Sequence, residues 1–258
     1  MLWLRRLQDR FRVRAVLVIA AVGLALAPAA VAGRSIPPLP AQLSPAARVK
    51  VQPVTDHPSL ATSVDGEPFV VRREIFEYLL DHPEFATHIT RALKLARYQI
   101  WATPAGLAID DGWGTKGTFE VVHAAAGTRV MYARGVYEQR ILPDIHGQAV
   151  VIIDYGAQPG PDGRSTIRTA LTGYVRLDSS LLDWAGRLAS GVARAKADKE
   201  ASGLARLFAK TSRAIEDNPT AVYEAVRQRP GVPQRELAEF ARLLNVTAGG
   251  TASVPGSR

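Results

Sequence analysis

The chain has 258 residues, 47% of them hydrophobic, and contains no cysteine. This length and composition fit one large or two small globular domains, and the lack of cysteine excludes disulfide frameworks, thiolate nucleophiles and cysteine-ligated metal centres. The formal charge of +8 falls to +4 once residues 1–32 are set aside, because that segment holds five arginines against one aspartate. The remaining charges of both signs are interleaved, so we expect no nucleic-acid partner.

Residues 1–32 have the three parts of a secretory signal peptide. Basic residues between Arg5 and Arg14 precede an apolar run that starts at Ala15, and Ala30-Val31-Ala32 matches an A-x-A cleavage site. The alternative is an uncleaved anchor, since an uncharged run of this length begins to span a bilayer. In both cases the positive charges stay on the cytoplasmic side of the membrane, and the rest of the chain lies outside the cytoplasm. We therefore expect a protein that is periplasmic or secreted if the segment is cleaved, and membrane-anchored if it is not.

Two further segments have the composition of unfolded chain. Residues 33–64 are rich in proline with little apolar periodicity, which predicts an extended tether. Residues 246–258 contain Gly249-Gly250, Pro255 and Gly256, which predicts a disordered tail. The part expected to fold therefore runs from about residue 65 to residue 245.

The folded part is predicted to open with a short strand and two helices. An apolar run at 68–71 is followed by helical spacing of Ile75, Phe76, Leu79 and Leu80. Asp81-His82-Pro83 interrupts this pattern, and because proline is favourable at the first helical position, a second helix should begin at Pro83.

From residue 97 the apolar period changes to alternation, and turn residues divide the region into six strand-like runs. Their short connections predict antiparallel hairpins. The last run places apolar and polar residues on opposite faces, so one face should be buried and the other wet. The six runs are 97–103, 106–113, 117–125, 129–139, 148–156 and 165–178.

Helical spacing then returns and continues to the end of the folded part. Asp178-Ser179-Ser180 supplies N-cap residues for one long amphipathic helix from Ser180 to Asp217. A helical extension at 218–245 should follow, with helices at 219–228 and 233–244 that each have a proline at their start.

This order of elements resembles the START-like superfamily of polyketide cyclases and lipid-transport proteins, also called helix-grip proteins. The resemblance covers about residues 65 to 217, and its most specific local part is the turn between Phe76 and Phe85. It implies an α+β fold in which a curved antiparallel sheet of six to seven strands packs on the long C-terminal helix. It also implies a cavity between them for a lipid, sterol, polyketide or other hydrophobic small molecule.

The inward face of the sheet and the facing helix supply the candidate ligand-binding residues. Small residues such as Ala133 and Gly135 on the sheet, and Gly186 and Ser190 on the helix, indicate either a cavity or close backbone packing. His123 is of special interest, since alternation places it inward, where it could hold a ligand head group, move a proton, or be an ordinary core histidine. The candidate binding residues are Phe119, His123, Met131, Gly135, Tyr137, Tyr155, Leu171, Trp184 and Leu188.

No nucleophile, P-loop or zinc-protease motif is present, so the sequence assigns no catalytic residue, metal or cofactor. Asp144 and His146 share a loop and could act as an acid–base pair, although polar residues are common in such turns. We expect a monomeric, non-enzymatic binder or carrier of a hydrophobic small molecule or lipid outside the cytoplasm. The alternatives are a cyclase- or aromatase-type enzyme that uses His123 or the Asp144–His146 loop, and an envelope interaction protein with a filled core.

Overall fold

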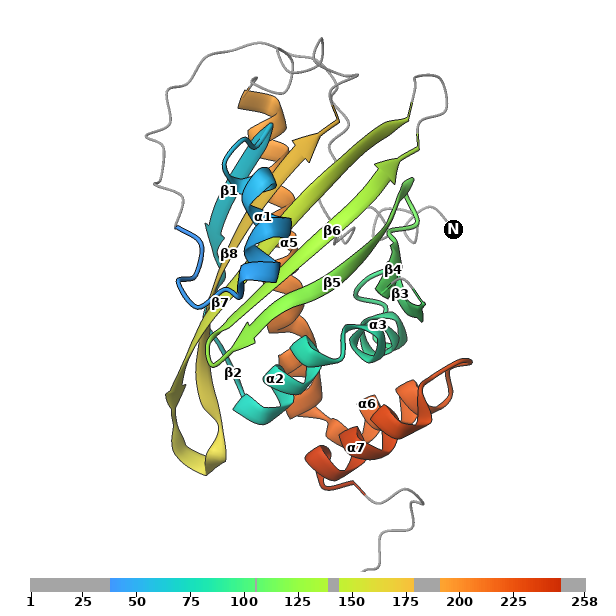
Figure 1. Ribbon diagram of the computed structural model, residues 1–258. Helices are drawn as coiled ribbons and strands as arrows, with labels where there is room; N and C mark the ends of the chain where they lie inside the picture. The colour runs from blue at the N-terminus through green and yellow to red at the C-terminus, as the bar shows by residue number, and fades with distance from the viewer. Residues whose placement is uncertain (1–37, 105, 139–143, 179–190, 247–258) are drawn as a thin grey trace, which may run out of the picture.

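The computed structural model describes residues 38–104, 106–138, 144–178 and 191–246. Eight strands form one curved antiparallel sheet, with helix α5 on one face and helix α1 on the other, while four shorter helices gather at one end (Figure 1). The predicted α+β helix-grip fold, a curved antiparallel sheet on a long C-terminal helix, is confirmed. The helices are α1 Pro45–Thr55, α2 Arg73–Asp81, α3 Pro83–Ala92, α5 Gly191–Asp217, α6 Pro219–Arg227 and α7 Gln234–Leu244.

The strands follow one another in the sheet almost in the order of the sequence. They are β1 Leu60–Asp65, β2 Phe69–Val71, β3 Gln99–Thr103, β4 Gly106–Asp110, β5 Thr115–Ala125, β6 Thr128–Tyr137, β7 Ile145–Pro159 and β8 Ser165–Leu177. The order across the sheet is β1-β8-β7-β6-β5-β4-β3, and β2 also pairs with β8. All six runs predicted by alternation are strands. Strand β1 is additional, because its residues lie in the segment predicted to be a tether.

The face of the sheet toward α5, called the inner face, carries the residues that matter for a ligand. Phe119, Met131, Val151 and Leu171 share this face through the antiparallel register of β5 to β8. The opposite, outer face carries a second apolar cluster, which packs under α1 and contains Val130, Tyr132, Val150, Ile152 and Tyr174. The expectation of one wet face is therefore wrong for the middle of the sheet.

Helix α1 also corrects the prediction of an extended tether at 33–64. Ser44 caps the helix by accepting a hydrogen bond of 3.1 Å from the Ala47 amide, and Pro45 stands at its start, where a missing N–H costs nothing. Ala47, Val51 and Val54 recur at spacings of four and three, and all are buried against the outer face. The proline content of the segment suggested an extended chain, but Pro45 starts a helix and Pro53 lies within its last turn.

Three glycines in register allow the sheet to bend. Gly117 pairs with Gly135, and Gly135 pairs with Gly147, so the three form a row across β5, β6 and β7 on the inner face. A Cβ on Gly117 would collide with the carbonyl oxygen of Arg134, and one on Gly147 would lie 2.8 Å from that of Arg176. Glycine therefore permits a backbone approach that no other residue could make here.

The C-terminal helices belong to the same core as the sheet. Helices α6 and α7 match the predicted helices at 219–228 and 233–244, and they pack on α2 and α3. Phe76 and Phe85 share one cluster of buried residues with Val226 and Phe240. The predicted boundaries at 65 and 217 are thus too narrow, since α1, β1, α6 and α7 are all part of one packed unit. The predicted start of the long helix at Ser180 lies outside the described residues.

Among the described residues, no helix combines the length and the apolar character that crossing a membrane requires.

Candidate ligand-binding cavity

An apolar cavity of about 130 Å³ lies between the inner face of the sheet, the α2–α3 turn and the middle of α5. The sheet forms one wall with residues from β3 to β7, the two short helices form a second, and α5 closes the third. Its lining residues are Leu79, Leu80, Pro83, Ala86, Tyr98, Ile100, Ile109, Phe119, Met131, Ala133, Val151, Ile153, Leu204 and Phe208.

The α2–α3 turn reaches over the sheet because proline breaks the helix at a fixed point. His82 leaves helical geometry with φ −122° and ψ 64°, and Pro83 starts α3. The Tyr78 ring stacks on the His82 imidazole with centroids 4.1 Å apart, and the Tyr78 hydroxyl donates a 3.0 Å hydrogen bond to the Glu236 carbonyl on α7. The turn is therefore held from behind by α7, while Leu79 and Pro83 face the cavity.

Tyr98 is the one titratable side chain among the described lining residues. Burial raises the pKa of Tyr98 to about 12, and a hydrogen bond with Thr90 acts in the opposite direction. The phenol is consequently neutral at physiological pH, and Tyr98 brings the one hydroxyl group found among the described lining residues. It suits orientation of a ligand by hydrogen bonding, and it is a poor proton donor or acceptor for catalysis near neutral pH.

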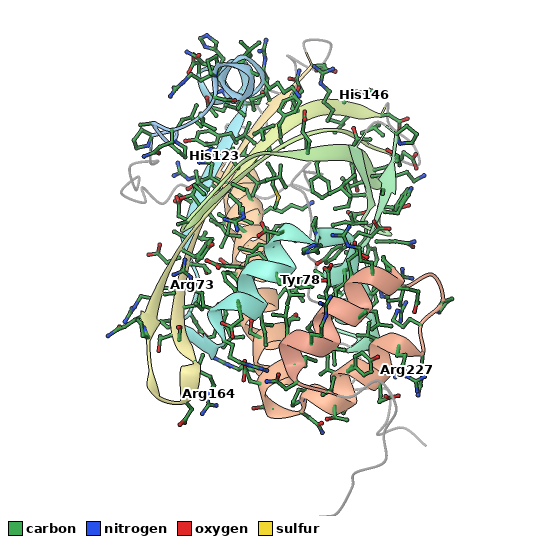
Figure 2. All side chains as sticks on the ribbon, turned by 60° about the horizontal axis from the view of Figure 1, so that its bottom comes forward. Arg73, Tyr78, His123, His146, Arg164 and Arg227 are labelled. Atoms are coloured by element: carbon green, nitrogen blue, oxygen red, sulfur yellow. The ribbon has the colours of Figure 1, made fainter. Side chains whose placement is uncertain are left out.

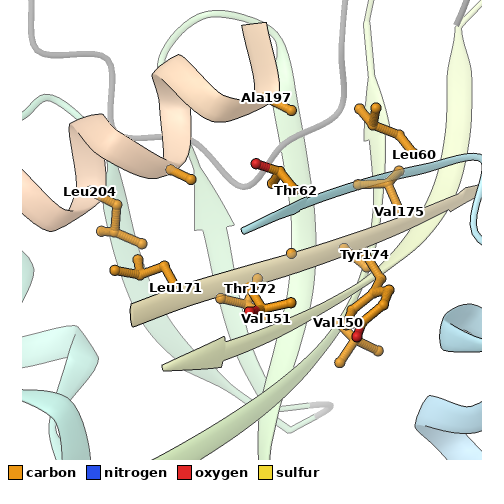
Figure 3. Close-up of a pocket in the computed structure, with 13 residues that line it drawn as sticks. Leu60, Thr62, Val150, Val151, Leu171, Thr172, Tyr174, Val175, Ala197 and Leu204 are labelled. Carbon is orange, nitrogen blue, oxygen red and sulfur yellow. The ribbon is translucent and has the colours of Figure 1, made fainter. Parts of the chain in front are cut away.

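A second, smaller cavity of about 40 Å³ adjoins the first under α5 (Figure 3). It lies between α5, β1 and β8, and it shares Val151 and Leu204 with the larger cavity. Ala197 and Ala201 face it from the helix, so short side chains leave the gap. Beside it the Thr62 hydroxyl donates a hydrogen bond to Asp198, which ties β1 to α5.

The structure brings three of the predicted binding residues to these cavities. Phe119 and Met131 line the larger one and Leu171 lines the smaller one. Gly135 instead lines a hollow of about 10 Å³ at the glycine row. Tyr137 ends β6 opposite Thr115 and lines none of these spaces.

His123 points away from the cavities, which corrects its predicted inward position. Val121 pairs with Met131, but His123 pairs with Val130, so Val122 is an extra residue in β5 and forms a β-bulge. The bulge shifts the alternation by one residue and turns His123 to the outer face, the side on which α1 lies (Figure 2).

Tyr155 does lie on the inner face, but it belongs to a polar cluster under α2 and not to a cavity. Its hydroxyl donates a 2.8 Å hydrogen bond to Glu77 and accepts one of 3.3 Å from Arg129. Burial, followed by the hydrogen bond to Glu77, raises the pKa of Tyr155. This cluster fastens α2 to the sheet.

The remaining candidates are not among the described residues that line the cavities. Trp184 and Leu188 lie outside the described residues. Two tryptophans outside that candidate set, Trp101 and Trp113, are 38% and 41% exposed. His146 pairs with Val136 on the outer face and is exposed, so the Asp144–His146 pair is remote from the cavity lining.

Several cavity residues were missed at the level of sequence. Leu79 and Leu80 were predicted only as part of a helix face, Tyr98 only as part of a strand, and Ala86 was not singled out. Leu204 and Phe208 are four residues apart on α5, one turn of helix, and both point at the sheet. Their helical spacing can be read from the sequence, but which turn of α5 lies over the cavity depends on how the helix crosses the curved sheet.

No protein-family model and no curated protein matches the chain. Similar solved structures include a hypothetical protein from Helicobacter pylori, at 13% identity over 72% of this chain and 100% of that one, with a TM-score of 0.39. Ara h 8.0201 is 13% identical over 60% of this chain and 99% of that one, with a TM-score of 0.34. A truncated norcoclaurine synthase from Thalictrum flavum is 10% identical over 57% of this chain and 93% of that one, with a TM-score of 0.29. Likenesses at these TM-scores carry no argument about function.

Proposed function

We propose that this protein binds a hydrophobic small molecule, or the apolar part of a lipid, in the cavity between the sheet, the α2–α3 turn and α5, without transforming it. The observation that carries the proposal is the cavity itself: a partly open space of about 130 Å³ whose described lining is apolar apart from Tyr98. An apolar ligand that fills this space gains the free energy of removing apolar surface, its own and that of the lining, from water.

The volume limits what fits. A cavity of about 150 Å³ accepts a molecule the size of benzene, and pockets for drug-sized ligands measure roughly 300–1,000 Å³. The ligand is therefore either a small molecule or a larger one that inserts one ring or alkyl end. A longer ligand could extend past Val151 and Leu204 into the smaller cavity, which shares these two residues. The Tyr98 hydroxyl favours a ligand with a polar group beside its apolar part.

A cyclase- or aromatase-type activity finds less support in this arrangement. Such a reaction needs a group that exchanges protons near pH 7 in contact with the substrate. His123 lies on the outer face, His146 is exposed, and the phenol of Tyr98 has a pKa of about 12. The third alternative, an interaction protein with a filled core, is disfavoured by the cavity.

We also propose that binding takes place outside the cytoplasm, as a periplasmic or secreted protein or one anchored at its N-terminus. The support is the order of basic start, apolar run and Ala30-Val31-Ala32 in the sequence. Terminal sequencing of the protein from its native host should give a mature start near Gly33, and replacing Ala30 and Ala32 with large residues should block processing. Recovery of full-length soluble protein from the cytoplasm of that host would contradict export.

Binding is tested by filling the cavity. We expect the parent protein to bind a fluorescent fatty acid or a small aromatic probe, and to release a bound apolar molecule on solvent extraction. Ala133→Leu and Ala86→Leu place three extra carbons each into the cavity and should weaken probe binding about tenfold or more, since each buried methylene contributes about 0.8 kcal/mol to transfer.

The matched control is Ala124→Leu, the same change at an exposed position of β5. It should bind like the parent. In a tightly packed core, the two cavity variants would be destabilised by about 1–3 kcal/mol. A parent that binds no probe and carries no extractable ligand, together with destabilised variants, would refute the proposal.

A further inference from the structure

Three basic side chains lie near one another where α3 packs against α6 and the turn that follows it, on the flank of α3 away from the cavity. His88 and Arg91 are three residues apart on α3, and Arg229 lies just after the end of α6. Pro83 and Ala86, which line the cavity, lie on the other side of α3 by helical spacing. The cluster is therefore separate from the proposed ligand site.

Two nitrogen atoms of this cluster are buried without a hydrogen-bond partner. They are Nδ1 of His88, a residue only 9% exposed, and Nε of Arg229. Among the residues that the structure describes, none of the three basic side chains forms a salt bridge or a side-chain hydrogen bond. A buried polar group left unpaired costs about 1–3 kcal/mol, and more if charged, so such groups normally have a partner.

The electrostatic surroundings are positive. Burial lowers the pKa of His88 first, and the nearby Arg229 and Arg91 lower it further. Burial and the charge of Arg91 also lower the pKa of Arg229. Glu84 lies one turn before His88, yet neither shift has an acidic cause, so this carboxylate does not neutralise the cluster.

We propose that His88, Arg91 and Arg229 form a binding site for a phosphate group. The unpaired Nε of Arg229 is a donor, and Nδ1 of His88 is one when it carries the ring proton, while Arg91 and Arg229 provide two positive charges at a partly exposed edge through which an anion can enter. A phosphate group offers several acceptor oxygens and a charge near −2, which fits guanidinium donors and a histidine ring better than a single-atom anion does. Bound phosphate also links α3 to the α6–α7 turn.

The phosphate comes either free in solution or on a lipid head group, and two probes distinguish these sources. The first is inorganic phosphate, compared with chloride at equal ionic strength. The second is phosphatidylcholine vesicles with and without phosphatidic acid. The His88 ring resonance, assigned with His88→Gln among the five histidines, reports binding. Thermal unfolding gives an independent readout.

Phosphate should raise the melting temperature of the parent saturably and raise the apparent pKa of His88, because an adjacent anion favours the imidazolium. Arg229→Gln should weaken phosphate binding about tenfold or more, since a hydrogen bond to a charged group contributes about 1.5–3 kcal/mol. Without phosphate this variant should be at least as stable as the parent, because one of the clustered charges is removed. Arg227→Gln is the matched control, since Arg227 is exposed on α6, pairs with Glu224 and is labelled in Figure 2.

A response to inorganic phosphate assigns the site to free phosphate, and a response to phosphatidic acid vesicles alone assigns it to a head group. Absence of both responses would overturn the proposal. It would also fall if Arg229→Gln and Arg227→Gln kept the phosphate response of the parent, or if Arg229→Gln were destabilised without phosphate, because the arginine would then be an ordinary packing residue.

Discussion

Arg129 and Asp81 form a bidentate ion pair that fastens α2 to the sheet, with Nε to Oδ1 at 2.6 Å and Nη2 to Oδ2 at 3.0 Å. Nη1 of Arg129 also donates to the Ala125 and Thr128 carbonyls and to the Tyr155 hydroxyl. The Arg129 side chain is buried on the inner face, and Asp81 is half-exposed. Since α2 carries Leu79 and Leu80 over the cavity, this pair positions one wall of it.

Asp81→Ala should therefore destabilise the protein and loosen the α2–α3 turn. The substitution leaves a buried guanidinium with two unpaired donors, and we expect a loss on the order of 2 kcal/mol after allowing for the exposure of Asp81. Urea unfolding measures the loss. Glu67→Ala removes an exposed carboxylate and is the control. Equal stability of the two variants would mean that the ion pair does not hold α2.

The burial of α1 gives a second prediction with a control in the same helix. Val51 is 0% exposed against the outer face, whereas Val49 is 75% exposed. Val51→Asp should cost several kcal/mol, on the order of the penalty for burying an unpaired charged group, and Val49→Asp should change stability by less than about 0.5 kcal/mol. Thermal unfolding distinguishes the two. Parent-like melting of Val51→Asp would show that α1 is not part of the fold.

The glycine row predicts a strong effect of a single methyl group. Gly117→Ala should destabilise the protein by about 1–3 kcal/mol, because its Cβ meets the backbone of Arg134 and the strands must separate. A Cβ on Gly156, also in the sheet, would have no heavy atom within 4 Å. Gly156→Ala should be neutral or slightly stabilising. The prediction fails if chemical denaturation gives both variants the same free energy of unfolding.

His88 predicts a pH dependence of stability with a defined sign. Its pKa in the folded protein is lowered from the ordinary value of 6.5. Below pH 6.5 the unfolded chain binds a proton that the folded protein resists, so the free energy of unfolding should fall as the pH drops from 6.5 to the lowered pKa. In buffers without phosphate, His88→Gln should flatten this part of the profile relative to the parent. An unchanged profile would mean that His88 titrates alike in both states.

The strands and hairpins could be predicted from sequence because alternation and turn glycines act locally. Gly127, with φ +84°, ends β5 at its hairpin, and Asp111 turns the chain after β4 by accepting hydrogen bonds from the Trp113 and Thr115 amides. Such features need only neighbouring residues. The same is true of Pro83, which starts α3 at the predicted residue.

The cavity and the face of His123 could not be predicted in the same way, since both depend on contacts between distant segments. One extra residue at Val122 reverses the direction of His123, and alternation alone does not reveal a bulge. That Leu204 and Phe119 line the same cavity follows from the curvature of the sheet and from how α5 crosses it. Helix α1 was missed because its stability comes from Val51 and Val54 packing on the outer face, and not from its own composition.

Met131 offers the most direct test of binding in the cavity. The chain has two methionines, Met1 and Met131, so labelling with ¹³C-methyl methionine gives at most two methyl signals, and Met131→Leu identifies that of Met131. Titration with an apolar ligand should shift this methyl signal saturably and give nuclear Overhauser contacts between the ligand and the methyl group. Ala133→Leu should abolish both effects, and Ala124→Leu should preserve them. A ligand that binds while the Met131 methyl signal stays unchanged, or that binds equally to Ala133→Leu, would contradict the account.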